Sequence, residues 1–325
     1  MKDKYILPRY KLTDQILLLA TDITAALCRL NNSGLLLRDR EKEEQLFRSE
    51  LEAWLLLDDT VDEEDPESPL RQQAEALLKK EDFQPELYER RDVLQAHLKL
   101  LHGIAVNPGS FRLEGPAWSD TKKRDYAPPS AKKVPDYVRS VLEWGNFGKK
   151  VVAHPLIQAS IIGFALDVVQ PFDEGSRLIS LLWQRLILEA WNPVFARVPF
   201  FTTLLDNADG YNLAIRNAVQ DENAGKFIEF NLLCIREALE RYLAVQQREQ
   251  EQQEGSRFVN ALLETLGDQT LSTKELMEGL KLKHRPTFRD HYLLPALQSG
   301  QVEMTIPDKP NSCRQKYRRC VPKKN

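Results

Sequence analysis

The sequence predicts a mainly α-helical protein that ends in a winged-helix domain. Two apolar runs, residues 156–169 and 178–188, are each long enough for a buried helix and flank one short polar turn. Residues 12–30 also place apolar side chains at helical spacing. Near the C-terminus, three helix-like stretches precede two short stretches that alternate like strands, which is the element order of a winged helix.

The composition bounds the class of protein. A chain of 325 residues is long enough for two or three domains. It has no run of about 18 apolar residues, and its first residues lack the apolar core of a signal peptide, so we expect a cytoplasmic protein without a membrane segment. The four scattered cysteines are typical of reduced thiols, and the five histidines have no metal-ligand spacing, which argues against a zinc site.

Charge is distributed unevenly along the chain. From Ser256 onward there are 13 Lys and Arg against 7 Asp and Glu, whereas the preceding residues have 32 against 41. A basic segment on an acidic body suggests nucleic acid or an acidic partner for that segment. A solvated surface explains the same charge equally well.

The first part of the chain predicts four helices. The helix over residues 12–30 ends in turn chemistry at residues 31–34, and a second helix follows over residues 40–57. The acidic, proline-containing residues 58–68 predict a solvated loop. Helices then resume at residues 71–80 and 88–101.

An irregular region separates these helices from the apolar runs. It begins at Pro108 and extends to Pro135, which starts another helix. A short strand or hairpin is expected around residues 112–116. A long ordered loop beside a helical core often carries function.

The polar turn is residues 170–177, Gln-Pro-Phe-Asp-Glu-Gly-Ser-Arg. Pro171 ends the first helix, Gly175 permits a positive φ, and the second helix starts near Ser176. Such a turn at a helix N-terminus favours an anion, typically phosphate, although many turns of this kind only connect helices. Asp173 and Glu174 would repel a bare phosphate unless a divalent cation lies between them.

Beyond this turn, helices are expected at residues 211–219 and 227–245, followed by a Gln/Glu-rich stretch that is either an exposed helical extension or a linker. The last segment predicts a helix at 258–266, a second capped by Ser272 or Thr273, and a third at 285–297. Strands are expected at residues 301–306 and 315–318. The third helix of a winged helix can enter a DNA groove, but many winged helices bind protein instead.

The polar turn resembles the motif of the Fic/Doc family, HPFx(D/E)GNGRxxR, in a degenerate form. Further similarity lies in the segment upstream of the motif, which carries a small β flap in the family, and in the helix that contains Tyr211. Residues 48–53 resemble the family's inhibitory helix, and the C-terminal residues resemble the winged-helix domain of many bacterial Fic proteins. The resemblance implies residues 1–90 as an N-terminal helical segment, 91–245 as a Fic-like core, 246–255 as a linker and 256–325 as the winged helix.

The resemblance also implies a chemistry. Fic enzymes typically move AMP from ATP to a protein hydroxyl, with a histidine as base, an acidic residue that holds Mg²⁺, and arginines that neutralise charge. Carried over residue by residue, Glu174 would bind the metal, and Glu52 would be the regulatory acid, unless it is an ordinary surface charge. The implied nucleotide-binding residues are Glu174, Gly175, Ser176, Arg177 and Tyr211.

The motif departs from the family pattern at three points. Gln170 replaces the histidine, the turn is one residue short at Ser176, and Ser180 replaces the second arginine. A carboxamide accepts no proton near neutral pH, and a missing base costs about 10²–10⁴-fold in rate. Neither His102 nor His154 is a convincing substitute.

We therefore expect a Fic-fold pseudoenzyme that binds ATP and Mg²⁺ weakly or not at all. One alternative is an active protein adenylyltransferase with a non-standard base. Another is a winged-helix regulator that binds DNA, for which the core supplies dimerisation. The sequence names no target protein.

Overall fold

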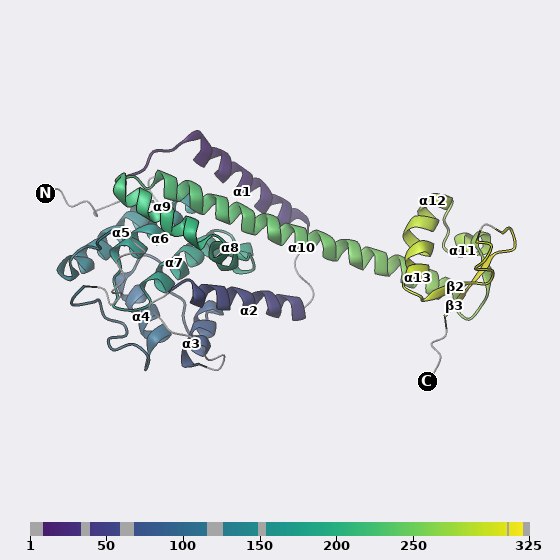
Figure 1. Cartoon of the computed structure of the whole chain (residues 1–325), viewed down its shortest axis with the longest axis horizontal. Coiled ribbons are helices and arrows are strands. Elements are labelled where there is room, and N and C mark those ends of the chain that lie inside the picture. The colour runs from purple at the N-terminus through teal and green to yellow at the C-terminus, as the bar shows by residue number, and fades with distance from the viewer. Residues whose placement is uncertain are drawn as a thin grey trace. The chain divides into compact units, whose positions relative to one another are not determined.

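The computed structural model describes residues 9–33, 40–58, 68–115, 126–148, 154–310 and 312–320. The chain divides into two compact units, Met1–Leu243 and Ala244–Asn325 (Figure 1). The long helix α10 (Gly225–Leu266) belongs to both units. No helix in the described part of the chain combines the length and the apolarity needed to cross a membrane.

All regular secondary structure in the described residues of unit 1 is helical. One short 3₁₀ turn, η1 (Ala131–Lys133), precedes the helix α5 (Val134–Gly148). A second, η2 (Pro193–Ala196), follows the helix α7 (Ser176–Trp191). Besides the first part of α10, its helices are α1 (Asp14–Ser33), α2 (Arg40–Leu56), α3 (Pro69–Leu78), α4 (Arg90–Leu101), α5 (Val134–Gly148), α6 (Pro155–Val169), α7 (Ser176–Trp191), α8 (Phe200–Asp206) and α9 (Ala208–Gln220).

The helices α6 and α7 form the centre of unit 1. Every residue of α6 after Pro155 is buried, as is every residue of α7 up to Glu189. A helix that is apolar all round is buried on all sides, and Figure 1 shows other helices of unit 1 around this pair. The two helices pack closely, because a Cβ on Gly163 of α6 would lie 2.1 Å from Cγ of Gln184 on α7. The turn that joins them is therefore held by the core of the unit.

Most predicted helices of unit 1 are present, with ends that differ by a few residues. Two expectations are not met. Asp58, predicted to start a solvated loop, is 3% exposed, and residues 59–67 lie outside the described part. The strand or hairpin expected around residues 112–116 is not found: residues 108–115 are irregular, and residues 116–125 lie outside the described part. The physical reason in both cases is tertiary contact with the α6–α7 turn.

Unit 2 consists of the end of α10 and a small helical domain with a three-stranded sheet. Its elements follow one another as helix, strand, helix, helical segment, strand and strand. This is the element order of a winged helix. They are β1 (Leu271–Ser272), α11 (Thr273–Gly279), α12 (Arg285–Thr287), the π-helical η3 (Phe288–Leu293), α13 (Leu294–Gln298), β2 (Val302–Met304) and β3 (Lys316–Arg319).

The sheet of unit 2 is antiparallel in the order β1-β3-β2. Val302 lies opposite Arg319, and Leu271 lies opposite Tyr317. Ser272, one of the two residues expected to cap α11, is its N-cap and forms a reciprocal arrangement with Glu275. The two-residue strand β1 was not expected, because so short a stretch has no alternation to recognise.

Residues 246–255, expected to be a helical extension or a linker, continue α10 without a break, so the helical alternative is the one found. Its Gln and Glu residues are good helix formers, which explains why the helix extends through a polar stretch. The boundary between the two compact units falls at Leu243 and Ala244, shortly before the expected linker.

Candidate functional site

The turn between α6 and α7 has the backbone conformation that its sequence predicts. Gly175 has a φ of 69° and precedes the first residue of α7, Ser176. Gln170 is also left-handed, with a φ of 50°, and its N–H donates to the Leu166 carbonyl at the end of α6. A left-handed residue other than glycine is uncommon, so the surroundings of Gln170 must hold this conformation.

Arg112 provides much of that support. Its guanidinium donates from Nε to the Gln170 carbonyl (2.6 Å), from Nη2 to the Pro129 carbonyl (2.5 Å), and from Nη1 to the Glu114 carbonyl (2.7 Å). The backbone N–H of Arg112 also donates to the Pro171 carbonyl at 3.0 Å. One buried side chain thus binds the irregular region before α5 to the turn.

His97 on α4 forms a second connection, which the sequence did not reveal. Its Nδ1 accepts from the Gly109 N–H (2.9 Å), so Nε2 carries the proton and donates to the Glu174 carbonyl (3.0 Å). The ring stacks on Phe172 with centroids 3.7 Å apart. Burial lowers the pKa of His97 to about 4. The helical spacing of Val93, Ala96 and Leu100 indicated a buried face of α4, but no local pattern indicated these partners.

The N-terminus of α7 is occupied by a side chain of the protein itself. Oδ2 of Asp58 accepts hydrogen bonds from the backbone N–H groups of Arg177 (3.0 Å) and Leu178 (3.3 Å). These are free donors of the first helical turn, to which a phosphate at this site would bind. Trp54, near the end of α2, also binds the first turn of α7, because its Nε1 donates to the Leu178 carbonyl (3.0 Å).

The side chain of Arg177 is bound within the core. Its Nε lies 3.2 Å from Oδ2 of Asp167 on α6, and its guanidinium lies over the Tyr211 ring at 5.3 Å. The Tyr211 hydroxyl donates to the same Asp167 oxygen at 3.1 Å. Burial alone would lower the pKa of Arg177, but Asp167 raises it above its ordinary value, so the guanidinium stays charged. Burial and Asp167 raise the pKa of Tyr211 well above its ordinary value.

Two further residues of the turn face inward. The Ser176 hydroxyl accepts from the Phe172 N–H (2.9 Å) and donates to the Phe172 carbonyl (3.1 Å). The Gln170 carboxamide donates to the Asp167 carbonyl (3.1 Å), and Gln170 is buried, with 2% of its surface exposed. Their side chains therefore stabilise the turn itself.

Asp173 and Glu174 are the half-buried acids of the turn. Burial raises the pKa of Glu174, and the negative charges of Asp173 and Asp58 raise it further. Three carboxylates thus lie close enough to influence one another at the start of α7.

The inhibitory-helix resemblance falls on α2. Glu52, the expected regulatory acid, is exposed, which agrees with the alternative of an ordinary surface charge. The buried acid of α2 is Glu50, whose carboxylate accepts from the N–H groups of Phe201 (2.9 Å) and Thr202 (2.8 Å) at the start of α8. Burial raises the pKa of Glu50, although the charge of Arg185 opposes this shift.

The histidines considered as substitute bases lie at helix ends. His154 precedes α6 and accepts from the Leu156 N–H through Nδ1 (3.3 Å), so it caps the start of this helix. It is separated from Gln170 by the full 15-residue length of α6, or about 22 Å. His102 follows α4 and is exposed.

A cavity of about 490 Å³ opens beside Arg177 and Tyr211. Its other lining residues are Leu56, Leu57, Ala208, Asp209, Asn212, Leu213 and Arg216. The cavity has the volume of a small-molecule site. However, the Arg177 charge is paired with Asp167, and Asp58 fills the neighbouring anion position.

The groups at the start of α7 that could bind a phosphate already have partners within the protein. The backbone donors of α7 are bound to Asp58, and the nearest acids would repel phosphate. Among the described residues, no group of three or more His, Cys, Asp or Glu side chains is arranged to hold a metal ion.

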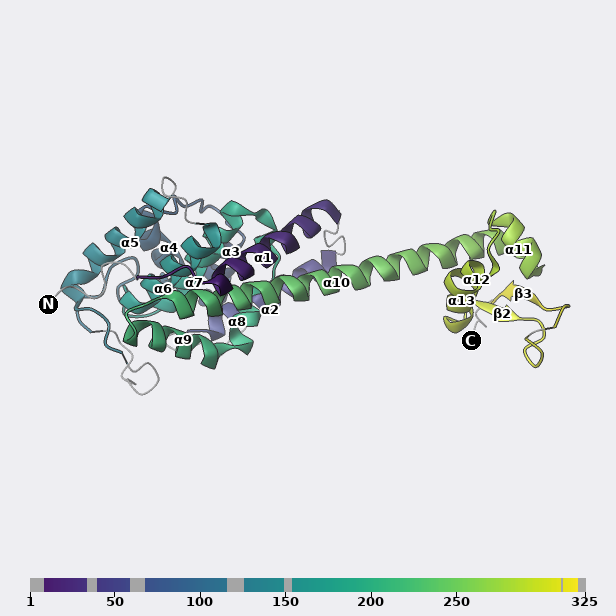
Figure 2. The same ribbon diagram turned by 90° about the horizontal axis from the view of Figure 1, so that it is seen from above.

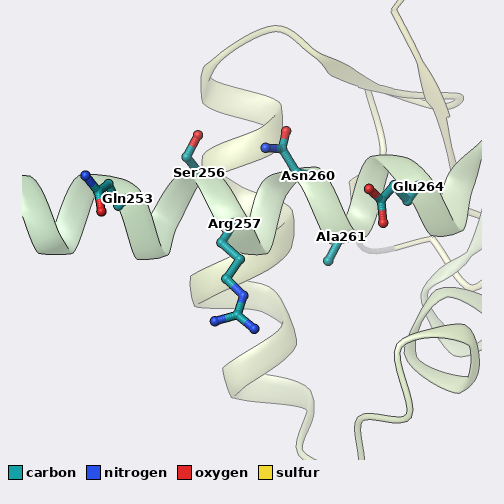
Figure 3. A pocket seen from close by; sticks show the side chains of 6 residues that line it. All are labelled: Gln253, Ser256, Arg257, Asn260, Ala261 and Glu264. Atoms are coloured by element: carbon teal, nitrogen blue, oxygen red, sulfur yellow. The ribbon is translucent and has the colours of Figure 1, made fainter. Parts of the chain in front are cut away.

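A second hollow, of about 410 Å³, lies on α10 in unit 2. Figure 3 shows Ser256 and Asn260 on one side of the helix and Arg257 pointing away from them. The remaining lining residues are Gln253, Ala261 and Glu264. All six belong to one helix, so this hollow is a shallow polar surface with no convergent groups.

Comparison with known proteins supports the family resemblance of the sequence. Residues 87–188 match the model of the Fic/DOC family. Residues 257–319 match the model described as filamentation induced by cAMP protein Fic-like, C-terminal domain. The chain therefore combines a Fic domain with the C-terminal domain of Fic-like proteins, and it belongs to the Fic/DOC family. Members of this family transfer a nucleotide monophosphate to proteins.

A solved structure with a TM-score above 0.5 shares this fold. The chain is similar to a Fic family protein from Desulfovibrio desulfuricans G20, with 26% identity, a TM-score of 0.65, and coverage of 98% of this chain and 99% of that chain. It is also similar to a fragment of Fic-1 from C. elegans, with 17% identity, a TM-score of 0.43, and coverage of 77% and 65% respectively. A comparison with curated proteins finds no match.

Proposed function

We propose that this protein is a non-catalytic member of the Fic/DOC family, in which the degenerate motif has become a structural centre and the protein acts by binding partners. The observation that carries the proposal is the occupation of the α7 N-terminus by Asp58. Its Oδ2 lies 3.0 and 3.3 Å from the nitrogens of Arg177 and Leu178, where a nucleotide phosphate would have to bind.

The retained motif residues support the same conclusion. Arg177 is paired with Asp167 inside the protein, and moving it toward a phosphate would leave a buried carboxylate without its cation. Removing one partner of a buried pair costs about 3–5 kcal/mol. The side chain of Ser176 is likewise engaged, in hydrogen bonds to the backbone of Phe172.

Neither the residue at the family's base position nor the histidine beside the turn is suited to act as the general base. Gln170 carries a carboxamide, which does not accept a proton near neutral pH. His97 is the histidine in contact with the turn, but both of its ring nitrogens are engaged and its pKa is lowered to about 4. A group with that pKa and no free lone pair is a poor acceptor for a hydroxyl proton.

The test is incubation of the full chain with Mg²⁺ and α-labelled ATP, with ATP binding measured in parallel by calorimetry. Three variants accompany the wild type: Gln170→His, Asp58→Ala, and the two combined. Asp22→Ala, which removes a partly exposed acid of α1, is the matched control. We expect no label and no ATP binding in the wild type, in Gln170→His or in the control.

The Asp58 variants separate the two parts of the proposal. ATP binding that appears only after Asp58→Ala supports the filled phosphate position. AMP label that appears only in the double variant supports the proposal that transfer is prevented both by the missing base at Gln170 and by Asp58 in the phosphate position. Label in the wild type means that the protein is an active adenylyltransferase with a non-standard base and overturns the proposal, and tight ATP binding by the wild type contradicts the filled position.

A further inference from the structure

Unit 2 carries a concentration of exposed basic side chains in its last 40 described residues. They lie in three places: before and within the helical segment Arg285–Gln298, in the loop between β2 and β3, and on β3. Figure 2 shows this loop extending beyond the helices of unit 2. The exposed members are Lys281, Lys283, Arg285, Arg289, Lys309, Arg314, Lys316, Arg318 and Arg319.

Most of these charges have no ion-pair partner within the described chain, although the charge of Lys316 helps to lower the pKa of Glu275. Only Arg318 forms an ion pair, with Glu303 on the adjacent strand. The same 40 described residues contain three acids, Asp290, Glu303 and Asp308, against nine exposed basic side chains. Like charges gathered without counter-charges repel one another, and an anionic partner would remove that repulsion.

The surface of unit 2 offers little apolar area for a protein partner. Large exposed apolar side chains occur at eleven described positions of the chain, and ten of them belong to unit 1. The exception, Val245, lies at the very start of unit 2. Protein interfaces are usually anchored by buried aromatic and apolar side chains, whereas a nucleic-acid backbone is bound chiefly through charge.

The helical segment has the geometry for a DNA groove. The elements α12, η3 and α13 follow one another without a break over residues 285–298. Phe288, Leu293 and Ala296 face the core, whereas Arg285 and Arg289 are exposed and one helical turn apart. The DNA major groove is about 12 Å wide and admits such a helix.

We propose that unit 2 binds double-stranded DNA, with Arg285 and Arg289 facing the groove or its flanking phosphates and the β2–β3 loop on the neighbouring backbone. The contacts that the charges support are with phosphates, which position a protein without reading sequence. This proposal does not depend on whether the Fic domain transfers nucleotide, so the two can fail separately.

The test measures binding of the full chain to a fluorescein-labelled 30-base-pair DNA of random sequence, by anisotropy between 50 and 200 mM salt. We expect binding that weakens steeply with salt. The double variant Arg285→Gln/Arg289→Gln should reduce the slope of log K against log salt by about 2, and should weaken binding at 100 mM salt by roughly 50-fold. Lys309→Gln/Arg314→Gln should act in the same direction.

The matched control is Arg248→Gln/Lys226→Gln, which removes two exposed charges from α10 before the hydrophobic cluster of unit 2 begins at Val259. It should leave the affinity and the salt slope unchanged. No DNA binding at 50 mM salt, or equal losses in the control and the Arg285/Arg289 variant, overturns the proposal. So does tighter binding of poly-glutamate than of DNA, which would assign the surface to an acidic protein.

Discussion

Asp167 and Arg177 form an ion pair inside the core of unit 1, with Oδ2 of one 3.2 Å from Nε of the other. The exposed fractions of their side chains are 0% and 7%. The pair links the last turn of α6 to the first turn of α7, and the Tyr211 hydroxyl completes it from α9. The motif arginine of this protein therefore has a structural partner.

Replacement of Asp167 should be strongly destabilising. Asp167→Ala leaves the buried Arg177 charge unpaired, so we expect the free energy of unfolding to fall by about 3–5 kcal/mol. Tyr211→Phe, which removes one hydrogen bond, should cost about 1 kcal/mol. Urea unfolding followed by tryptophan fluorescence measures both changes, because all five tryptophans lie between residues 54 and 191 of unit 1. Asp22→Ala, at a partly exposed pair with Arg236, should change stability by less than about 1 kcal/mol.

His97 should make the stability of unit 1 depend on pH. Its pKa is about 4 in the folded protein and 6.5 when unfolded, so between these values the unfolded state binds more protons. Stability should therefore fall as the pH drops from about 6.5 to about 4, by up to about 3 kcal/mol. The raised pKa of Glu174 gives a slope of opposite sign, so the contribution of His97 is the difference between wild type and His97→Gln. Equal pH dependence in the two proteins would contradict this assignment.

The close packing of Gly163 against Gln184 predicts a steric effect. In Gly163→Ala the new Cβ would lie 2.1 Å from Cγ of Gln184, whose own movement is limited by complete burial. We expect a loss of about 1–3 kcal/mol, and a partial recovery when Gln184→Ala is added. Gly255→Ala on α10 meets no atom within 4 Å and should be neutral or stabilising by up to about 1 kcal/mol. Thermal unfolding monitored by circular dichroism measures all of these variants.

Arg112 should be irreplaceable even by lysine. Its three guanidinium nitrogens reach the carbonyls of Gln170, Pro129 and Glu114, and an ammonium cannot span these acceptors. In Arg112→Lys we expect faster hydrogen exchange at the backbone amides of residues 108–115 and a stability loss of about 2 kcal/mol or more. Arg139→Lys, at an exposed pair with Asp136, is the control and should change neither quantity measurably. Unaltered exchange in Arg112→Lys would show that the irregular region is held by other contacts.

Much of the helical fold is accessible from sequence because its signals are local. The apolar runs around residues 156–188 are too long and too continuous for anything but buried helices, and Pro171 and Gly175 mark the turn between them. Ser272 identifies the start of α11 by the capping chemistry that it performs. By contrast, the acidic, proline-containing stretch from Asp58 predicts a solvated loop, whereas Asp58 itself is buried. Charge and proline content indicate the average exposure of a stretch and not the position of one side chain. A single acid that meets free helix N–H groups is stabilised in a buried position.

The sequence by itself determined most of the helices of this protein and which turn is central, and its resemblance to the Fic motif placed Gln170 where the family has a histidine. Only the tertiary structure decided which distant residues bind the turn between α6 and α7 and the helix ends beside it. Asp58 meets Arg177 across 119 residues, and His97 meets Glu174 across 77. Tyr211 reaches Asp167 across 44 residues. Such contacts leave no periodic trace in the chain, because they depend on how helices pack rather than on the spacing of residues along any one of them.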